Sequence, residues 1–398
     1  MADTSHDSPN WGLVGVGADG AEMASRVVTG ATRAAFDDRI ALLGTNVADL
    51  REYAERIGAI ETGDSRSAVA DTDRVVTFGP SLGPQFDLTG IVAAERRFRA
   101  DTERIVKPLR RVLDGADAIA YLAPLDGRAN WAVPTLVDRI GAAANGQPSD
   151  GQDGTRLPRQ FIITTLPSDG DAIQSRFDAC YTLFGLLGPD DRQSARTTFL
   201  ASKPTLQEQY PSDPMDTPPR AGSNGLPHGP IVGAVELFVA ASRRFDATSS
   251  THGTFGLARD YPIGLEPSVA IESAAESTFA PLDLSTVDSV SLVVSAPEKR
   301  IQSDAITAAG VADAFDSWAA ERGISERTRE SRLVSRSGGG HTFDVLLVPR
   351  GFDLGPVFDP LQDAYEQSKA MLERSGASRD LARAERLERR VRNLDNDD

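Results

Sequence analysis

The sequence predicts an α/β fold: a Rossmann-like parallel sheet covered by helices on both faces, followed by a second α/β domain. Strand-like and helix-like segments alternate along residues 11–202, which is typical of parallel sheets. Several strand segments are apolar throughout, as expected for strands buried on both faces. The first, which contains Leu13, Val14 and Val16, ends in a glycine turn that leads into a helical pattern at residues 21–29. This stretch predicts the strand–turn–helix unit that opens the sheet.

The following elements are expected to continue this alternation. We predict strands at residues 39–46, 116–124, 159–167 and 197–202, and helices at residues 47–56, 91–113 and 172–187. A further helix is indicated by an apolar face formed by Val133, Leu136, Val137 and Ile140. Residues 1–10, 143–158 and 203–230 are polar or rich in Gly and Pro, so we expect loose segments there. The first domain is assigned to residues 11–230.

The second half of the chain predicts a connecting helix, a smaller domain and a tail. Residues 231–245 are apolar nearly all round, which is typical of a buried helix, and we assign residues 231–250 to a connector between domains. Residues 251–356 predict an α/β domain with at least one antiparallel strand pair. Its strands are expected at 253–259, 289–295, 330–335 and 342–349, and its helices at 267–278 and 304–322. Residues 357–398 form a charged helical tail, either solvated or docked on a partner.

The composition points to an acidic protein. The formal net charge is −16, which disfavours nucleic acid and anionic membranes as general partners. Only four of the 42 basic residues are lysines: Lys107, Lys203, Lys299 and Lys369. Abundant acid with scarce lysine suits a salt-rich cytoplasm, where screening reduces self-repulsion. GC-rich coding also favours arginine over lysine, so both explanations stay open.

Cysteine, histidine and hydropathy patterns give further expectations. The one cysteine, Cys180, excludes an internal disulfide and a multi-cysteine metal site, and its apolar neighbours predict an inert core position. The four histidines lie far apart in the sequence, so no metal site is expected. No stretch has the length and apolarity of a membrane span, and the first ten residues lack the pattern of a signal peptide. We therefore expect a cytoplasmic protein without direct membrane insertion.

The glycine turn has the spacing Gly15-x-Gly17-x-x-Gly20. Such a turn lets main-chain N–H groups and a helix N-terminus approach a phosphate closely, although the same spacing occurs in turns that bind nothing. One interpretation is a dinucleotide-dependent oxidoreductase. That mechanism needs an acid at the end of the second strand to hold the ribose hydroxyls, and Gly44, Thr45 and Asn46 stand there instead. The oxidoreductase is therefore the less favoured hypothesis.

Three stretches carry a resemblance to a known family. They are the turn itself (GVGADGAEMA, residues 15–24), the stretch LGTNVADL (residues 43–50), and Gly115-Ala116-Asp117 between a long helix and a strand. In this order they resemble the tubulin/FtsZ superfamily, most closely its archaeal FtsZ and CetZ branches. The resemblance covers residues 11–352.

The resemblance implies GTP or GDP as the cofactor, and self-association or binding to other tubulin/FtsZ-type filaments. It implies a cytoskeletal role in cell division or cell shape. The residues that stand at the positions of the family's nucleotide-binding stretches, and are the candidate cofactor-binding residues, are Gly15, Gly17, Ala18, Asp19, Gly20, Thr45, Asn46, Gly127 and Arg128.

Two departures from the family pattern argue against GTP hydrolysis. Where the family has the glycine-rich stretch GGGTGTG, residues 125–131 read LDGRANW, so only Gly127 remains. Asp126 would repel a phosphate and Trp131 would fill space at the helix start, while Arg128 is a candidate phosphate partner. The acidic loop that activates water in the family is also unmatched, because Asp246 and Asp260 do not fit its spacing. We expect a degenerate GTP site without assigned catalytic residues; a slow GTPase that still binds GTP is the alternative.

Overall fold

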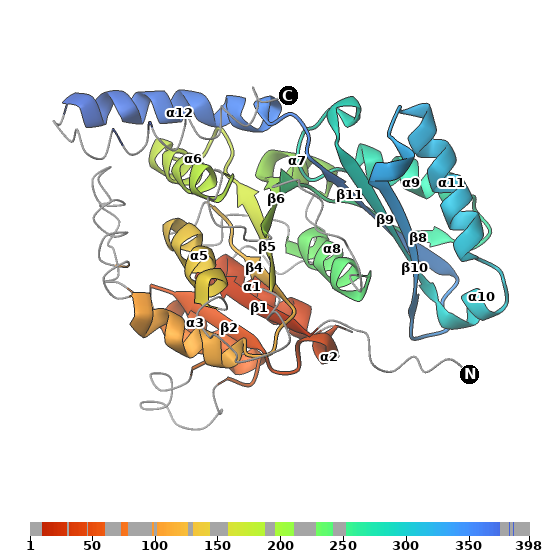
Figure 1. The fold of residues 1–398 in the computed structure, drawn as a ribbon, viewed down its shortest axis with the longest axis horizontal. Helices are drawn as coiled ribbons and strands as arrows, with labels where there is room; N and C mark the ends of the chain where they lie inside the picture. Colours follow the sequence, from red (N-terminus) through yellow and green to blue (C-terminus); the bar gives the residue numbers. More distant parts are fainter. Residues whose placement is uncertain are drawn as a thin grey trace, which may run out of the picture. The chain divides into compact units, whose positions relative to one another are not determined.

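The computed structural model describes residues 10–29, 32–45, 47–59, 73–78, 98, 102–125, 130–143, 158–187, 196–210, 228–241, 252–374, 382 and 385 (Figure 1). They fall into two compact units. The N-terminal unit combines Pro9–Thr198 with Phe358–Asp398, and the C-terminal unit comprises Phe199–Val357. The chain passes from one unit to the other within strand β6 (Arg196–Ser202).

A parallel sheet forms the centre of the N-terminal unit, which confirms the predicted fold class. Its strand order is β5-β4-β1-β2-β3, and every pairing is parallel. The strands are β1 (Trp11–Val16), β2 (Ile40–Gly44), β3 (Val75–Thr77), β4 (Ala118–Leu122) and β5 (Arg159–Leu166). The side chains of β1, β2 and β4 are buried throughout, because helices cover both faces of a parallel sheet. The short strand β3 is not predicted by the sequence.

Helices connect these strands as crossovers. They are α1 (Gly17–Thr29), α2 (Arg33–Phe36), α3 (Val47–Arg56), residues 102–112, α5 (Val133–Ala143) and α6 (Ile173–Leu187). Helices α1 and α3 pack together, as do α5 and α6. The predicted apolar face of α5 is buried, and so is Cys180 on α6. Helix α1 begins four residues earlier than expected, directly after β1.

Helix α12 (Gly355–Arg374) returns to the N-terminal unit and packs on α6. The Tyr365 ring stacks on Phe177 at 5.8 Å between centroids, and Phe358 stacks on Phe184 at 5.4 Å. Tyr365 is also edge-on to Phe184 at 5.3 Å. Such aromatic pairs add about 0.5–1.5 kcal/mol each beyond their buried area. This part of the predicted tail is therefore docked within the chain rather than solvated.

The C-terminal unit is built on a mixed sheet of order β10-β9-β11-β8. Strands β9 (Ser289–Pro297) and β10 (Arg329–Arg336) are parallel, and β11 (Thr342–Arg350) is antiparallel to both β9 and β8 (Gly256–Pro262). The short strand β7 (His252–Gly253) also pairs with β11. The antiparallel pairing expected from the sequence is confirmed.

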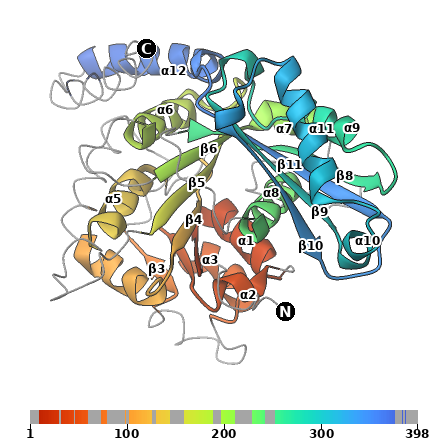
Figure 2. The ribbon, with the colours of Figure 1, turned by 45° about the vertical axis from the view of Figure 1, so that its right-hand side comes forward.

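Helix α9 (Pro267–Glu276) and helix α11 (Ala308–Glu321) lie side by side against this sheet (Figure 2). Their apolar faces meet the strands in one core that includes Ile271, Phe315 and Val294. Helix α8 (His228–Ala241), the predicted connector, packs on β8, β9, β10 and β11. Helix α10 (Glu298–Gln302) follows β9.

Two further segments differ from expectation. The predicted loose segment 203–230 begins with helix α7 (Lys203–Gln209), because Pro204 suits the first helical turn and Leu206 is buried. The predicted helix 304–322 starts at Ala308, where the Thr307 hydroxyl caps it by accepting from the Gly310 N–H at 3.1 Å. In the part of the chain that the structure describes, no helix is long and apolar enough to cross a membrane.

Substitution of Gly20 tests the contact between α1 and β4. A Cβ at Gly20 would overlap the carbonyl oxygen of Leu122, which belongs to a sheet that cannot move aside. We expect Gly20→Ala to lower the free energy of unfolding by about 1–3 kcal/mol, measured by urea denaturation. Gly170→Ala is the control in the same unit: its Cβ would meet only the Ser168 hydroxyl, at 3.8 Å, and the change should stay within about 0.5 kcal/mol. Equal stability of the two variants would contradict the packing.

Candidate functional site

The strand order of the N-terminal unit defines where a ligand would bind. From β1 the chain runs outward through β2 and β3 on one side, and β4 and β5 lie on the other. Open parallel sheets bind ligands beyond the carboxyl ends of the strands at such a reversal point. Gly15 near the end of β1 is in register with Leu122 at the end of β4. The β1–α1 turn and the β4–α5 connection therefore leave the sheet at the same place.

The glycine turn passes from strand to helix without intervening residues. Gly17 has φ = +73°, a conformation that strains other residues, and α1 begins there directly after Val16. Gly20 lies against the Leu122 carbonyl, and a Cβ at Gly15 would be 2.7 Å from the Gly20 carbonyl oxygen. Gly15 and Gly20 thus have a packing reason, and Gly17 a conformational reason, that involves no ligand. The geometry nevertheless leaves the N-terminus of α1, with its unpaired N–H groups, at the strand ends.

The charges beside this turn are negative. Residues 10–25, 40–50 and 118–125, which form the strand ends and the first turn, contain no lysine or arginine. Ala18 is exposed and Asp19, in the first turn of α1, is half-buried. One turn further on, the Glu22 carboxylate pairs with Arg26 at 2.7 Å and accepts from the Tyr53 hydroxyl at 3.3 Å. Among the described residues, the first turn of α1 therefore presents a carboxylate and no cation to a ligand.

The pKa of Tyr53 on α3 reflects the negative charge beside the turn. Its pKa is raised from 10.0 to about 12, first by burial and then by the negative charges of Glu22 and Glu52. Asp19 contributes in the same direction. Because the phenolate is disfavoured by both low polarity and negative charge, the Tyr53 phenol stays neutral at physiological pH.

The structure places some of the predicted nucleotide-binding residues and not others. Gly15, Gly17, Ala18, Asp19 and Gly20 come together at the reversal point. Thr45 is half-buried at the end of the neighbouring strand β2. Asn46, Gly127 and Arg128 lie outside the described residues. Their participation stays a prediction.

An aromatic cluster of Phe78, Phe98 and Trp131 lies beyond the ends of β3 and β4. Trp131 sits in the 3-10 turn Asn130–Ala132 at the head of α5, and Phe78 directly follows β3. The three rings meet edge to face, with centroids 5.1–5.6 Å apart. Their exposures are 1%, 3% and 6% for Phe78, Phe98 and Trp131. The sequence singles out Trp131 as space-filling, which is confirmed, but it does not identify the two phenylalanines.

The described residues at the head of α5 are apolar and buried. Leu125 before it and Ala132 and Val133 after Trp131 are all buried. The Phe78 N–H donates to the Gly44 carbonyl at 3.0 Å, which fixes Phe78 against the end of β2. A phosphate cradle needs main-chain N–H groups open to the ligand and little side-chain bulk. The described residues at the head of α5 supply bulk instead.

No grouping of His, Cys, Asp and Glu among the described residues is arranged to hold a metal ion. After β2 stands Thr45, so an acid that would hold a ribose does not directly follow that strand. The geometry therefore gives no further support to the oxidoreductase hypothesis.

This fold was compared with known proteins, and only solved structures match it. No family model matches the sequence, and no curated protein matches it. Among solved structures, the GTPγS-bound protofilament of CetZ2 from Haloferax volcanii matches with a TM-score of 0.63 at 15% identity, covering 92% of this chain and 99% of that one. The GDP-bound monomer of CetZ1 from the same organism matches with 0.63 at 12%, covering 90% and 99%. An empty FtsZ dimer from M. jannaschii matches with 0.57 at 14%, covering 87% and 89%.

These likenesses extend over nearly the whole length of both chains. At 12–15% identity they concern the fold, and they confirm the tubulin/FtsZ fold that the ordered sequence stretches predict.

Truncation of Trp131 tests how much the aromatic cluster contributes to stability. We expect Trp131→Ala to lower the free energy of unfolding by about 3–5 kcal/mol, because a large buried side chain leaves a cavity between two rings. Ile173→Ala, in the same unit and 43% exposed, should cost less than about 0.5 kcal/mol. Urea denaturation followed by circular dichroism compares them. A Trp131 variant as stable as the Ile173 variant would show that the cluster is not packed as described.

Titration of Tyr53 tests the negative charge beside the turn. Glu22→Gln should lower the pKa of Tyr53 from about 12 toward 10.0, because it removes a carboxylate charge while burial remains. Glu55→Gln, which removes an exposed charge that pairs with Arg51, should leave it unchanged. Tyrosinate absorbance as a function of pH measures both, with Tyr53→Phe identifying the transition. Since the folded-state pKa is raised, the stability that the neutral phenol contributes is complete below pH 10 and is lost as the pH rises toward 12.

Proposed function

We propose that this chain, which has the fold of tubulin and FtsZ, is a cytoskeletal protein that forms or modulates filaments in cell division or cell shape. Its GTP site is degenerate, and it hydrolyses GTP weakly or not at all. It acts in the cytoplasm, on copies of itself or on other filaments of the tubulin/FtsZ type.

The aromatic cluster at the head of α5 carries this proposal. Binding a triphosphate requires N–H groups and cations that offset several negative charges. Here the strand ends supply Asp19 and no lysine or arginine, and a buried indole stands where α5 begins. Arg128 is the one cation in the β4–α5 connection, and Asp126 lies two residues before it. The excess of acidic over basic residues and the bulk of the indole therefore favour a site that does not retain nucleotide.

The acidic residues after α8 do not support hydrolysis. Asp260 has φ = +59°, and its N–H donates to the Asp344 carboxylate at 2.9 Å, at the irregular pairing of β8 with β11. That position makes Asp260 a part of the strand edge rather than a water-orienting group. Asp246 lies outside the described residues. We assign no catalytic residue.

The structural neighbours support assembly as the retained property. One of them is a protofilament and another is a dimer, and both match this chain along most of its length. We infer that a chain with this fold and a degenerate nucleotide site has retained the surfaces used in assembly and has lost GTP hydrolysis. Association with itself or with related filaments is the role that such surfaces serve.

A second candidate is a polymerising GTPase that binds GTP and turns it over slowly. The left-handed Gly17 and the immediate start of α1 favour it, because this geometry brings a helix N-terminus to the strand ends. Two neighbours hold GTPγS and GDP. In this alternative Arg128 is the phosphate partner.

Nucleotide content separates the two candidates. We expect the full chain, purified at high salt, to release far less than one nucleotide per molecule on denaturation, measured by chromatography. Added radiolabelled GTP should bind at least 100-fold more weakly than to an FtsZ assayed in the same buffer. Stoichiometric bound GTP or GDP would overturn the degenerate site. In that case Arg128→Ala should abolish binding, which would support the second candidate.

Sedimentation tests the cytoskeletal role. We expect the chain to pellet by itself, or together with preformed tubulin/FtsZ-type filaments, and to do so equally with and without GTP. Assembly only in the presence of GTP would favour the polymerising GTPase. A chain that neither associates with itself nor binds such filaments would contradict the cytoskeletal proposal altogether.

A further inference from the structure

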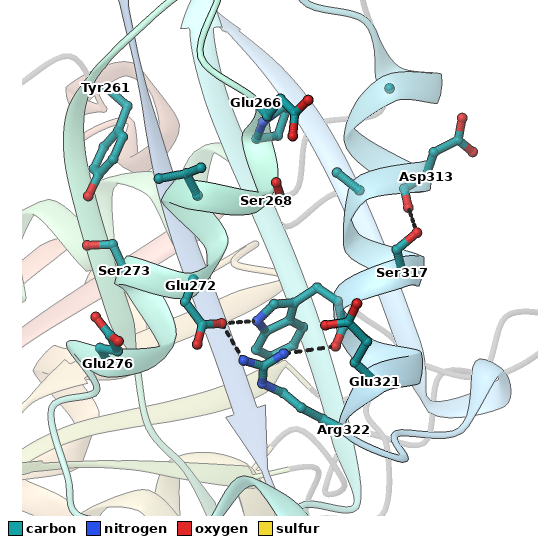
Figure 3. Close-up of a pocket in the computed structure, with 15 residues that line it drawn as sticks. Tyr261, Glu266, Ser268, Glu272, Ser273, Glu276, Asp313, Ser317, Glu321 and Arg322 are labelled. Atoms are coloured by element: carbon teal, nitrogen blue, oxygen red, sulfur yellow. Dashed lines mark hydrogen bonds and ion pairs between the residues drawn. The ribbon is translucent and has the colours of Figure 1, made fainter.

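A groove of about 990 Å³ runs between α9 and α11 on the surface of the C-terminal unit, and all of its lining residues belong to that unit (Figure 3). Each helix lines it with residues three or four positions apart, so one face of each helix forms a wall. The helices are about 15 and 21 Å long at 1.5 Å per residue, so roughly three turns of another helix fit along the groove. Several lining residues are small and leave this space open: Ser268, Ser273, Gly310, Ala314 and Ser317.

The groove is more acidic than the chain as a whole. Five carboxylates and one guanidinium give its fifteen lining residues a net charge of −4, whereas all 398 residues together carry −16. The general acidity of the protein therefore does not account for this concentration of charge. Four of the carboxylates, two beside α9 and two on α11, are exposed and form no ion pair with a described residue: Glu266, Glu276, Asp313 and Glu321.

The fifth carboxylate already binds an arginine of the chain. The Arg322 guanidinium pairs with the Glu272 carboxylate and lies over the Trp318 ring, 4.6 Å from its centroid. The same carboxylate accepts a hydrogen bond from the indole N–H of Trp318 at 2.7 Å. Figure 3 shows Glu272 reaching from α9 to both residues. The groove thus holds a guanidinium between an aromatic face and a carboxylate, which are the contacts that arginine side chains favour.

Apolar surface lies among the unpaired carboxylates. Val269 stands between Glu266 and Glu276 on the lining face of α9, and its side chain is 48% exposed. In the described part of the chain, three large apolar side chains are exposed, and two of them, Leu265 and Val269, lie just before α9 and in the groove. Exposed apolar side chains rimmed by charge are typical of a surface that binds another protein.

We propose that the α9–α11 groove binds an amphipathic helix of another protein, in which an apolar stripe has arginines on both sides. The stripe covers Val269, and the arginines pair with the carboxylates of the two walls. A helix suits the groove because its side chains repeat at the same spacing as those of the walls. The negative charge repels nucleic acid and anionic membranes. The groove shares no residue with the glycine turn, so this proposal and the proposed function can fail separately.

Peptide binding tests the charge complementarity. A fluorescein-labelled helical peptide of about four turns, with leucines along one face, arginines on both sides of them and alanines elsewhere, is titrated with the full chain. Anisotropy is measured at the lowest salt that keeps the chain folded. Glu276→Gln with Glu321→Gln should weaken binding by about fivefold or more, because each wall loses a carboxylate. The control, Glu298→Gln with Asp304→Asn, removes two exposed charges of the same unit outside the groove and should change the affinity less than about twofold.

A second substitution tests the apolar contact. Val269→Ser should weaken binding of the same peptide by about threefold or more, because the leucine face loses its partner in the groove. Ile173→Ser, which changes a side chain of similar exposure in the other unit, should leave the affinity unchanged. Equal effects of the groove and control variants would overturn the proposal. No binding of the peptide would overturn it, as would equal binding of a scrambled peptide, which would show attraction by charge alone.

Sedimentation velocity without peptide tests whether a second copy of the chain occupies the groove instead. The Glu276→Gln, Glu321→Gln variant should associate with itself to the same extent as the unchanged chain and as the Glu298→Gln, Asp304→Asn control. Circular dichroism confirms that both variants are folded. Loss of self-association in the groove variant alone would overturn the proposal, because the occupant would then be another copy of this chain.

Discussion

The contact between the first turn of α1 and the carboxyl end of β4 determines the geometry of the N-terminal unit. Helix α1 starts directly after the last residue of β1 and lies against the main chain of the neighbouring strand, so only glycine fits at residue 20. The direction of α1 and the position of the turn are thereby fixed by backbone packing. This constraint brings a helix N-terminus to the reversal point of the sheet, whether or not an anion is bound there. The glycine spacing is thus needed for the fold first and for a ligand second.

The other half of the reversal point has a different physical character. Trp131, Phe78 and Phe98 stabilise the unit by burying apolar surface beside the head of α5. In the degenerate site proposed above, stability and phosphate binding compete for the same space, because a buried indole excludes both water and ligand. The acids near the turn strengthen this effect. A helix N-terminus contributes the equivalent of about half a positive charge, which one nearby carboxylate offsets.

The sequence predicts those parts of the structure that depend on local pattern. Apolar runs identify β1, β2, β4 and β9, and the face of Val133 and Leu136 identifies α5. It does not predict β3, whose three residues are too few to show a period, or α7, which begins with Pro204 in a Pro-rich segment. In the candidate site, the bulk of Trp131 is evident from its side chain. Its partners Phe78 and Phe98 are not, because residues distant in sequence come together only through the sheet. The same holds for the ion pair of Glu272 on α9 with Arg322, the C-cap residue of α11.

The docking of α12 on α6 has a consequence for how the chain is made. The N-terminal unit is discontinuous in sequence, and the C-terminal unit is an insert within it. Phe177 and Phe184 are synthesised long before Phe358 and Tyr365, so an apolar patch on α6 stays uncovered while the whole insert emerges from the ribosome. The host unit is completed only by a helix that is translated after the whole insert. The N-terminal unit can therefore complete its folding only after the insert has been synthesised. A chain that stops before residue 358 would contain the C-terminal unit but would lack the helix that covers α6.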